Sequence, residues 1–173
     1  MKMLYKSIKY LCQLGLTIFM GTNLLFADDF IYTPPKQFTL DPKYIALHHP
    51  VKTDQLAAQL YFDQGLTQLY TFNNDMAYWS FLNASKIDPQ MAMAYWGMAL
   101  TLSPGYHTNI DPERKKAMDE AIQKAVELSE NGLEVESEYI SALAQKYAND
   151  SNKDPKKLEF EYSQKLKQIS QNH

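Results

Sequence analysis

Residues 58–89 read AQLYFDQGLTQLYTFNNDMAYWSFLNASKIDP and carry the spacing of two packed helices joined by a tight turn. The residues that set the register are small or aromatic, with a proline at the end: Gly65, Ala77, Phe81, Ala84 and Pro89. If Ala58 is the first position of a repeat of about 34 residues, Gly65 lies where two helices must come close. Ala77 then packs opposite it, and the aromatic and small residues that follow share its helix face. The stretch predicts an all-α fold of helical hairpin repeats.

This stretch and its surroundings resemble a family of exported bacterial tetratricopeptide-repeat proteins. The spacing above is the tetratricopeptide pattern of small, alanine, aromatic, alanine and proline positions. Further landmarks of the family are His48-His49-Pro50-Val51, Tyr61 to Leu66, Phe72-Asn73, Ser80-Phe81, Asp88-Pro89, Ala92 to Gly97 and Tyr139 to Tyr147. The similarity covers residues 48–170. It implies a helical repeat scaffold with no assigned reaction, in a family whose usual members are considerably longer.

Length and charge narrow the classes of function. The 173 residues fit one domain with a real core, and eight Pro and six Gly are few enough for a helical protein. The net charge is -3 and the sequence contains no run of Lys and Arg, so nucleic acid is not a predicted partner. The sequence has no nucleophile elbow, zinc-protease, P-loop or dinucleotide motif, and we expect neither an enzyme nor a cofactor.

The first 27 residues have the pattern of an export signal. Lys2, Lys6 and Lys9 precede a largely apolar run from Leu11 to Phe26, with cleavage expected after Ala27. The alternative is an uncleaved membrane anchor, although the run of about 16 residues is shorter than the roughly 20 that a spanning helix prefers.

Cleavage would leave a chain without cysteine, because the one cysteine, Cys12, lies inside the apolar run. Such a chain has no disulfide and depends on its core alone. We expect a periplasmic or secreted protein with no stable membrane insertion after the signal is removed.

The rest of the chain divides into an extended segment, residues 28–52, and a helical domain, residues 53–170. The segment is rich in proline and has no helical period, but it is too apolar to float freely, so we expect it to lie against the helices. The first helix should begin with Thr53 or Asp54 as N-cap and end near Tyr70. Later helices are predicted at residues 75–87, 90–102, 112–130, 134–148 and 155–170, with Asp111 and Asp154 beginning the fourth and sixth.

These helices make three hairpins, about the minimum for a stable stack. The sixth helix, with an apolar stripe from Leu158 to Ile169, could be a cap or the exposed end of a longer array, as in a partial gene product. An uncapped stack would favour self-association.

In a tetratricopeptide stack the first helix of each hairpin lines a concave groove. In this register the groove positions are Gln59, Phe62, Leu66, Leu69, Tyr70, Met93, Trp96, Leu100, Ser103 and Pro104. The apolar and aromatic members, predicted as the peptide-binding groove, are Phe62, Leu66, Tyr70, Met93, Trp96 and Leu100. Such a groove suits an apolar or extended peptide rather than an acidic tail. In the alternative reading, residues 30–50 of the chain fill the groove, and Phe62, Tyr70 and Trp96 are core.

Three other features could carry function. Trp79 stands where the second helix should face outward, as a contact surface or packed against a neighbour. Asp63 lies beside the groove, where a hydrolytic role is less expected than a hydrogen bond to a loop. His48, His49 and His107 could meet at the mouth of the groove and bind a metal or ligand, although adjacent histidines rarely face one ion. The prediction is a protein- or peptide-binding scaffold in the cell envelope; the alternative is a small metal- or ligand-binding envelope protein that uses these three histidines.

Overall fold

The computed structural model describes residues 32–33, 35–36, 38–104, 110–148 and 154–173. The predicted signal peptide, residues 1–27, and the candidate ligand His107 lie outside these ranges.

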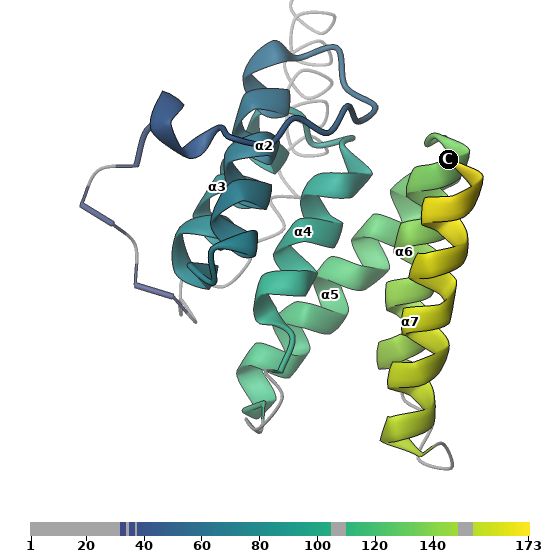
Figure 1. Ribbon diagram of the computed structural model, residues 1–173. Helices are drawn as coiled ribbons and strands as arrows, with labels where there is room; N and C mark the ends of the chain where they lie inside the picture. The colour runs from purple at the N-terminus through teal and green to yellow at the C-terminus, as the bar shows by residue number, and fades with distance from the viewer. Residues whose placement is uncertain (1–31, 34, 37, 105–109, 149–153) are drawn as a thin grey trace, which may run out of the picture. The chain divides into compact units, whose positions relative to one another are not determined.

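The described chain consists of α-helices in antiparallel pairs, with a single 3-10 turn before them. The elements are η1 (Pro42–Tyr44), α2 (Leu56–Tyr70), α3 (Asn74–Ile87), α4 (Ala92–Leu102), α5 (Pro112–Ser129), α6 (Glu134–Tyr147) and α7 (Pro155–Asn172). Each helix packs on the next one along the chain, and the first helices of the three pairs, α2, α4 and α6, also touch in succession (Figure 1). The predicted all-α fold of helical hairpin repeats is confirmed.

The aromatic ring of Phe81 is the centre of the core. A Cβ atom built on Gly65 of α2 would lie 2.6 Å from this ring, and one built on Gly97 of α4 would lie 2.5 Å from it. Ala77 and Ala84, on the same helix as Phe81, are fully buried. The ring therefore sits between the backbones of two first helices, at the close approach that the spacing predicts.

Side-chain caps begin several helices where the sequence predicts them. Asp111 accepts a hydrogen bond from the backbone N–H of Arg114 (2.8 Å), with Pro112 in the first turn of α5. Asp154 accepts one from Lys156 N (3.0 Å) at the start of α7. These acceptors satisfy N–H groups that have no partner within the helix.

Two predicted helix starts are wrong by a few residues. The helix α2 begins at Leu56, because the Thr53 hydroxyl donates to Asp88 Oδ2 (2.6 Å) instead of capping a helix. Asp88 also accepts from Gln90 N through its Oδ1 atom (3.0 Å), which holds residues before α4 in a turn. That helix consequently begins at Ala92 rather than at Gln90.

Of the two readings of Trp79, the structure supports packing against a neighbour, and the side chain does not face outward. Its side chain is 6% exposed and packs edge-on against Tyr78, with 5.7 Å between ring centroids. Tyr78 in turn contacts Tyr32, at 5.4 Å, so the chain before the helices covers this part of the hairpin.

Tyr32 is fixed to the end of α4 by a network around Arg114. The Tyr32 hydroxyl donates to the carbonyl of Thr101 (2.7 Å), and the Arg114 guanidinium donates to the Tyr32 hydroxyl (2.8 Å). The same guanidinium donates to the carbonyls of Thr101 (2.9 Å) and Leu102 (2.8 Å). It thereby satisfies carbonyls at the C-terminal end of α4, which have no partner within the helix.

The turn between α2 and α3 carries an exposed aromatic residue in an unusual conformation. Phe72 has a φ of 60°, in the left-handed region, and its side chain is 93% exposed. Asn73 follows as the N-cap of α3.

Among the described helices, none is long and apolar enough to cross a membrane.

Adding one methyl group at Gly97 should destabilise the fold. In Gly97→Ala the ring of Phe81 would have to move, and Gly65 blocks its other side. We expect the free energy of unfolding, measured by urea denaturation with circular dichroism, to fall by about 1–2 kcal/mol despite the better helix propensity of alanine. Gln123→Ala on the exposed face of α5 should change it by less than about 0.5 kcal/mol. An unchanged or higher stability of Gly97→Ala would contradict the close contact.

Alkaline pH should destabilise the protein through Tyr78. Burial raises the pKa of Tyr78 to about 12 from its ordinary value of 10.0. Between these values the unfolded chain has lost the phenol proton while the folded chain keeps it, so the stabilisation present below pH 10 is lost as pH rises toward 12. The loss should approach about 2–3 kcal/mol. Urea denaturation at several pH values should show a shallower decline for Tyr78→Phe; parallel curves would contradict the assignment.

Candidate functional site

An apolar cavity of about 250 Å³ lies where the first helices of the three pairs meet. Its walls come from α2, α4 and α6 and from a segment that precedes α2, and they comprise Leu47, His48, His49, Phe62, Leu66, Tyr70, Met93, Trp96 and Tyr139. Five of the six predicted groove residues are among them. Leu100, the sixth, lies on α4 but is not part of the lining.

The lining residues differ greatly in exposure. Phe62 and Met93 are almost fully buried, and the Phe62 ring contacts that of Phe81 at 5.5 Å, which joins the cavity wall to the core. Tyr70, in contrast, is 71% exposed at the end of α2. The two readings of the groove therefore apply to different residues: Phe62 is core, whereas Tyr70 is an accessible edge of the cavity.

Tyr139 belongs to the cavity, although it is not among the groove positions that the sequence predicts. Its ring makes an edge contact with Trp96 (6.0 Å between centroids) and another with His49 (6.4 Å). The residue lies on α6, the first helix of the third pair. Extending the repeat register to this third pair is the signal that could have identified it.

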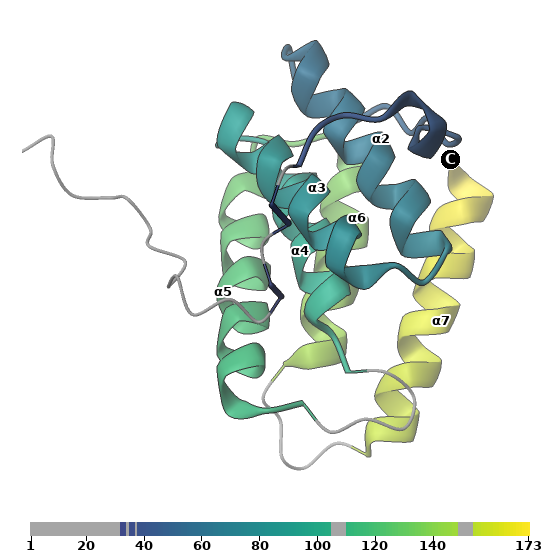
Figure 2. The ribbon, with the colours of Figure 1, turned by 90° about the vertical axis from the view of Figure 1, so that its left-hand side faces the viewer.

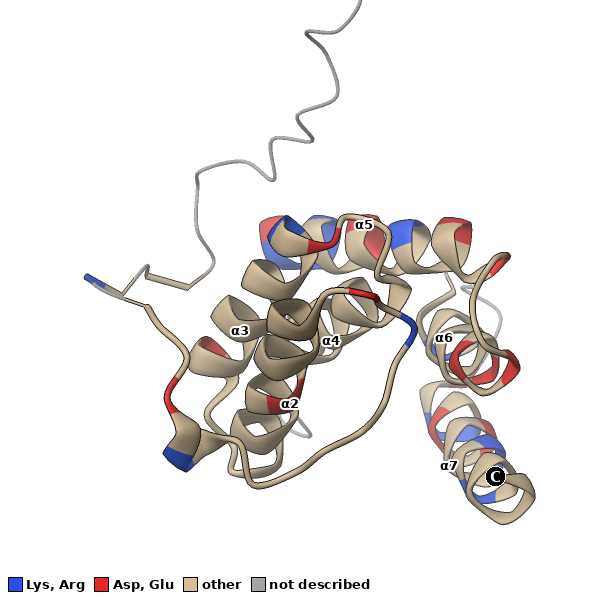
Figure 3. Ribbon diagram, turned by 90° about the horizontal axis from the view of Figure 1, so that it is seen from above, with Lys and Arg blue, Asp and Glu red and all other residues tan. Residues whose placement is uncertain are grey.

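None of the described residues that line the cavity is Lys, Arg, Asp or Glu. Charged residues are sparse on α2, α3 and α4 and frequent on α5, α6 and α7, as Figure 3 shows from above. On α7, burial raises the pKa of Tyr162 to about 12, with smaller contributions from Tyr147, Glu159, Tyr70 and Tyr139. Tyr162 thus lies near Tyr70 and Tyr139 of the cavity wall, and its own phenol is protonated at neutral pH.

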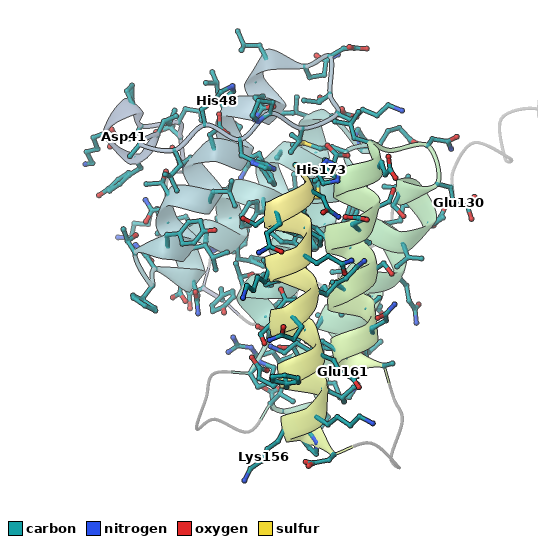
Figure 4. The ribbon with its side chains drawn as sticks, turned by 45° about the vertical axis from the view of Figure 1, so that its right-hand side comes forward. Asp41, His48, Glu130, Lys156, Glu161 and His173 are labelled. Atoms are coloured by element: carbon teal, nitrogen blue, oxygen red, sulfur yellow. The ribbon has the colours of Figure 1, made fainter. Side chains whose placement is uncertain are left out.

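Residues Asp41–Val51, called the strap below, run along α2 and are held mainly through their backbone. Figures 1 and 2 show this dark blue segment beside α2, and Figure 4 labels Asp41 and His48 on it. The bonds run from Asp41 N to Gln64 Oε1 (2.8 Å), from Ala46 N and Leu47 N to Thr67 Oγ1 (3.2 and 3.3 Å), from His49 N to Asp63 Oδ1 (3.1 Å), and from Val51 N to Gln59 Oε1 (3.0 Å).

The acceptors of these bonds form one row on α2, the acceptor row: Gln59, Asp63, Gln64 and Thr67. Gln59, Asp63 and Thr67 follow one another at spacings of four residues, and Gln64 lies three residues before Thr67, so these side chains occupy neighbouring positions on the helix surface. They satisfy backbone N–H groups of a segment that has no regular secondary structure apart from η1.

Asp63 is the centre of this row. It is 1% exposed and accepts hydrogen bonds from His48 Nδ1 (2.8 Å), His49 N (3.1 Å) and Gln59 Nε2 (3.0 Å). The Gln59 amide also donates to the His49 carbonyl (2.9 Å). Both carboxylate oxygens are engaged in holding the strap, which is the hydrogen-bonding role that the sequence favours over a hydrolytic one.

The predicted histidine site is only partly within the described residues. His48 is committed to Asp63, and the His49 ring lies between Phe62 (6.5 Å) and Tyr139 (6.4 Å). His107 lies outside the described ranges. In the parts of the chain that the structure describes, no group of three or more His, Cys, Asp or Glu residues could hold a metal ion.

A second, polar cavity of about 340 Å³ lies near the start of α2 and the turns before α4 and α6. Its most buried carboxylate, Glu136, accepts a hydrogen bond from Lys52 N (2.6 Å), and the Lys52 ammonium donates to the carbonyl of Asn131. Asp88 holds Thr53 and Gln90 in the same region. These contacts tie Lys52 and Thr53, which follow the strap, to α6 and to the turns before α4 and α6.

Comparison of the chain with protein-family models, with curated proteins and with solved structures finds no match.

Removing the Asp63 carboxylate should loosen the strap. In Asp63→Ala, the N–H groups of His49 and Gln59 lose a buried charged acceptor, and we expect the free energy of unfolding to fall by about 2–3 kcal/mol. Hydrogen exchange at residues 46–51 should accelerate more than in α4. Asp54→Ala, an exposed aspartate just before α2, serves as the control and should alter neither quantity. Equal effects of the two substitutions would contradict the central role of Asp63.

Proposed function

We propose that this chain is a peptide-binding helical repeat protein whose apolar cavity takes one large apolar or aromatic side chain from an extended segment of a partner protein. The observation that carries the proposal is the cavity itself: its walls come from the first helices of all three pairs, and five predicted groove residues line it. The tetratricopeptide-like register supports the same surface, because that family uses its first helices for binding.

The size of the cavity favours a side chain over a whole small molecule. Its volume of about 250 Å³ is below the roughly 300–1,000 Å³ of typical small-molecule sites. A partner's aromatic or leucine side chain would bury apolar area against Trp96 and Tyr139, and Tyr70 would cover it from the exposed side. The described lining residues carry no positive charge that would recognise an acidic peptide tail, and an apolar segment fits them better. With the predicted export signal, we place this activity in the cell envelope.

Tyr70 offers the sharpest test, because it lines the cavity and yet is 71% exposed. Peptides would be selected from a displayed random library on the immobilised chain, and their dissociation constants measured by fluorescence anisotropy. We expect them to share an apolar or aromatic anchor whose replacement by alanine abolishes binding. Tyr70→Ala should weaken binding by about tenfold or more, as the loss of an aromatic contact at an anchor does.

Phe72→Ala is the matched control for this test. Phe72 is an even more exposed aromatic residue two positions further along, and it does not line the cavity. Its substitution should leave peptide affinity unchanged, and both variants should keep their helical circular dichroism. Two outcomes would show that the cavity is not the binding site. One is an equal peptide affinity of Tyr70→Ala and the unaltered chain; the other is a loss of affinity in Phe72→Ala as large as that in Tyr70→Ala.

A further inference from the structure

The contacts of the strap are of a kind that any extended peptide could make. Five of its backbone N–H groups donate to the acceptor row, as described above, and only one strap side chain, that of His48, bonds to the row. Backbone N–H groups occur in nearly all sequences, so these contacts do not distinguish one peptide from another. The contact with Asp63 does, because it requires a particular side chain. The acceptor row therefore recognises an extended backbone with one selective position.

The central part of the strap buries little of itself. No residue from Pro42 to Pro50 is buried; Leu47 is 40% exposed, and the His48 side chain is 65% exposed. Apolar attachments lie on either side of this part. Before it, Phe38 stacks on Tyr61 with 6.0 Å between ring centroids, and after it Val51 is buried. A segment held by hydrogen bonds with few apolar contacts opens at a lower free energy than the whole fold.

The strap and the apolar cavity are parts of one site. Leu47, His48 and His49 line the cavity and also belong to the part of the strap that the acceptor row holds. Release of these residues would remove one wall of the cavity. It would also free Thr67 and Asp63 to accept hydrogen bonds from another backbone.

We infer that the acceptor row is a second part of the peptide site, occupied by the chain's own strap, and that the partner's extended segment binds by replacing residues 46–49. This inference rests on the proposed function and extends it to the chemistry of the partner. The incoming backbone donates N–H groups to Thr67 and Asp63, and its anchor side chain enters the cavity. Opposite the buried Asp63 carboxylate it carries a histidine, lysine or arginine, the place now taken by His48.

The strap's own sequence supplies the probe. A fluorescent peptide, YIALHHPV, corresponding to residues 44–51, would be titrated into the purified chain and followed by anisotropy. In the His48→Ala chain the internal competitor loses its bond to Asp63. We expect this chain to bind the probe about tenfold more tightly than the unaltered chain does, since a bond to a charged group contributes roughly that factor.

Two controls separate recognition from general loosening. Lys43→Ala changes an exposed strap residue whose side chain pairs with Asp41 instead of the acceptor row, and it should leave the affinity unchanged. A probe with alanine in place of the first histidine should bind the His48→Ala chain about tenfold more weakly. Equal binding of the two probes, or equal affinities of the unaltered and His48→Ala chains, would overturn the inference.

Hydrogen exchange supplies a readout that does not depend on any peptide. Amides of Ala46, Leu47 and His49 should exchange through local opening, with lower protection than the amides of α4. If they exchange only on global unfolding, the strap does not open and the inference fails. A different result would contradict the proposed function, namely that Tyr70→Ala binds the selected peptides with unchanged affinity.

Discussion

The contact of one aromatic ring with two glycines sets the spacing of the first two helix pairs, on which the cavity depends. Phe81 reaches from α3 between α2 and α4, and only glycine at Gly65 and Gly97 lets both backbones come this close to the ring. Because the ring fixes the spacing of the first two pairs, it also fixes the positions of Phe62, Met93 and Trp96 on the helices beside it. The cavity is the space that remains when these side chains meet the third pair through Tyr139.

The helix α2 supports both parts of the site because it carries two kinds of side chain on adjoining positions. Phe62, Leu66 and Tyr70 give the cavity its apolar wall, whereas Asp63 and Thr67 hold the strap. Burial of a carboxylate is costly unless it is paired and hydrogen-bonded, and the strap provides three donors for Asp63 together with Gln59. The buried Asp63 carboxylate on α2 therefore needs the donors of the strap unless another backbone supplies them.

The sequence predicted the helical pairs well because their signals are local: small residues at close approaches, Asp-Pro at helix starts and an aromatic residue at fixed spacing. It predicted most of the cavity for the same reason, since the repeat register assigns the inner face of α2 and α4. The sequence left Trp79 open between an exposed and a packed position, because its neighbour Tyr78 is contacted by Tyr32, about 45 positions earlier in the chain. Tyr139 was missed because the third pair has a weaker register. The acceptor row depends on contacts between a helix and a segment without periodicity, which no spacing rule describes.

The network around Arg114 has a further consequence for the strap. It holds Tyr32 on α4, while Val51 is bound to Gln59 at the other end, so residues between them remain attached even when the middle of the strap is released. A released strap therefore stays at a high effective concentration next to its site, of the order of millimolar for a short tether. If a partner segment displaces the strap as we propose, it would hold the site only when its concentration and affinity together outweigh those of the tethered strap.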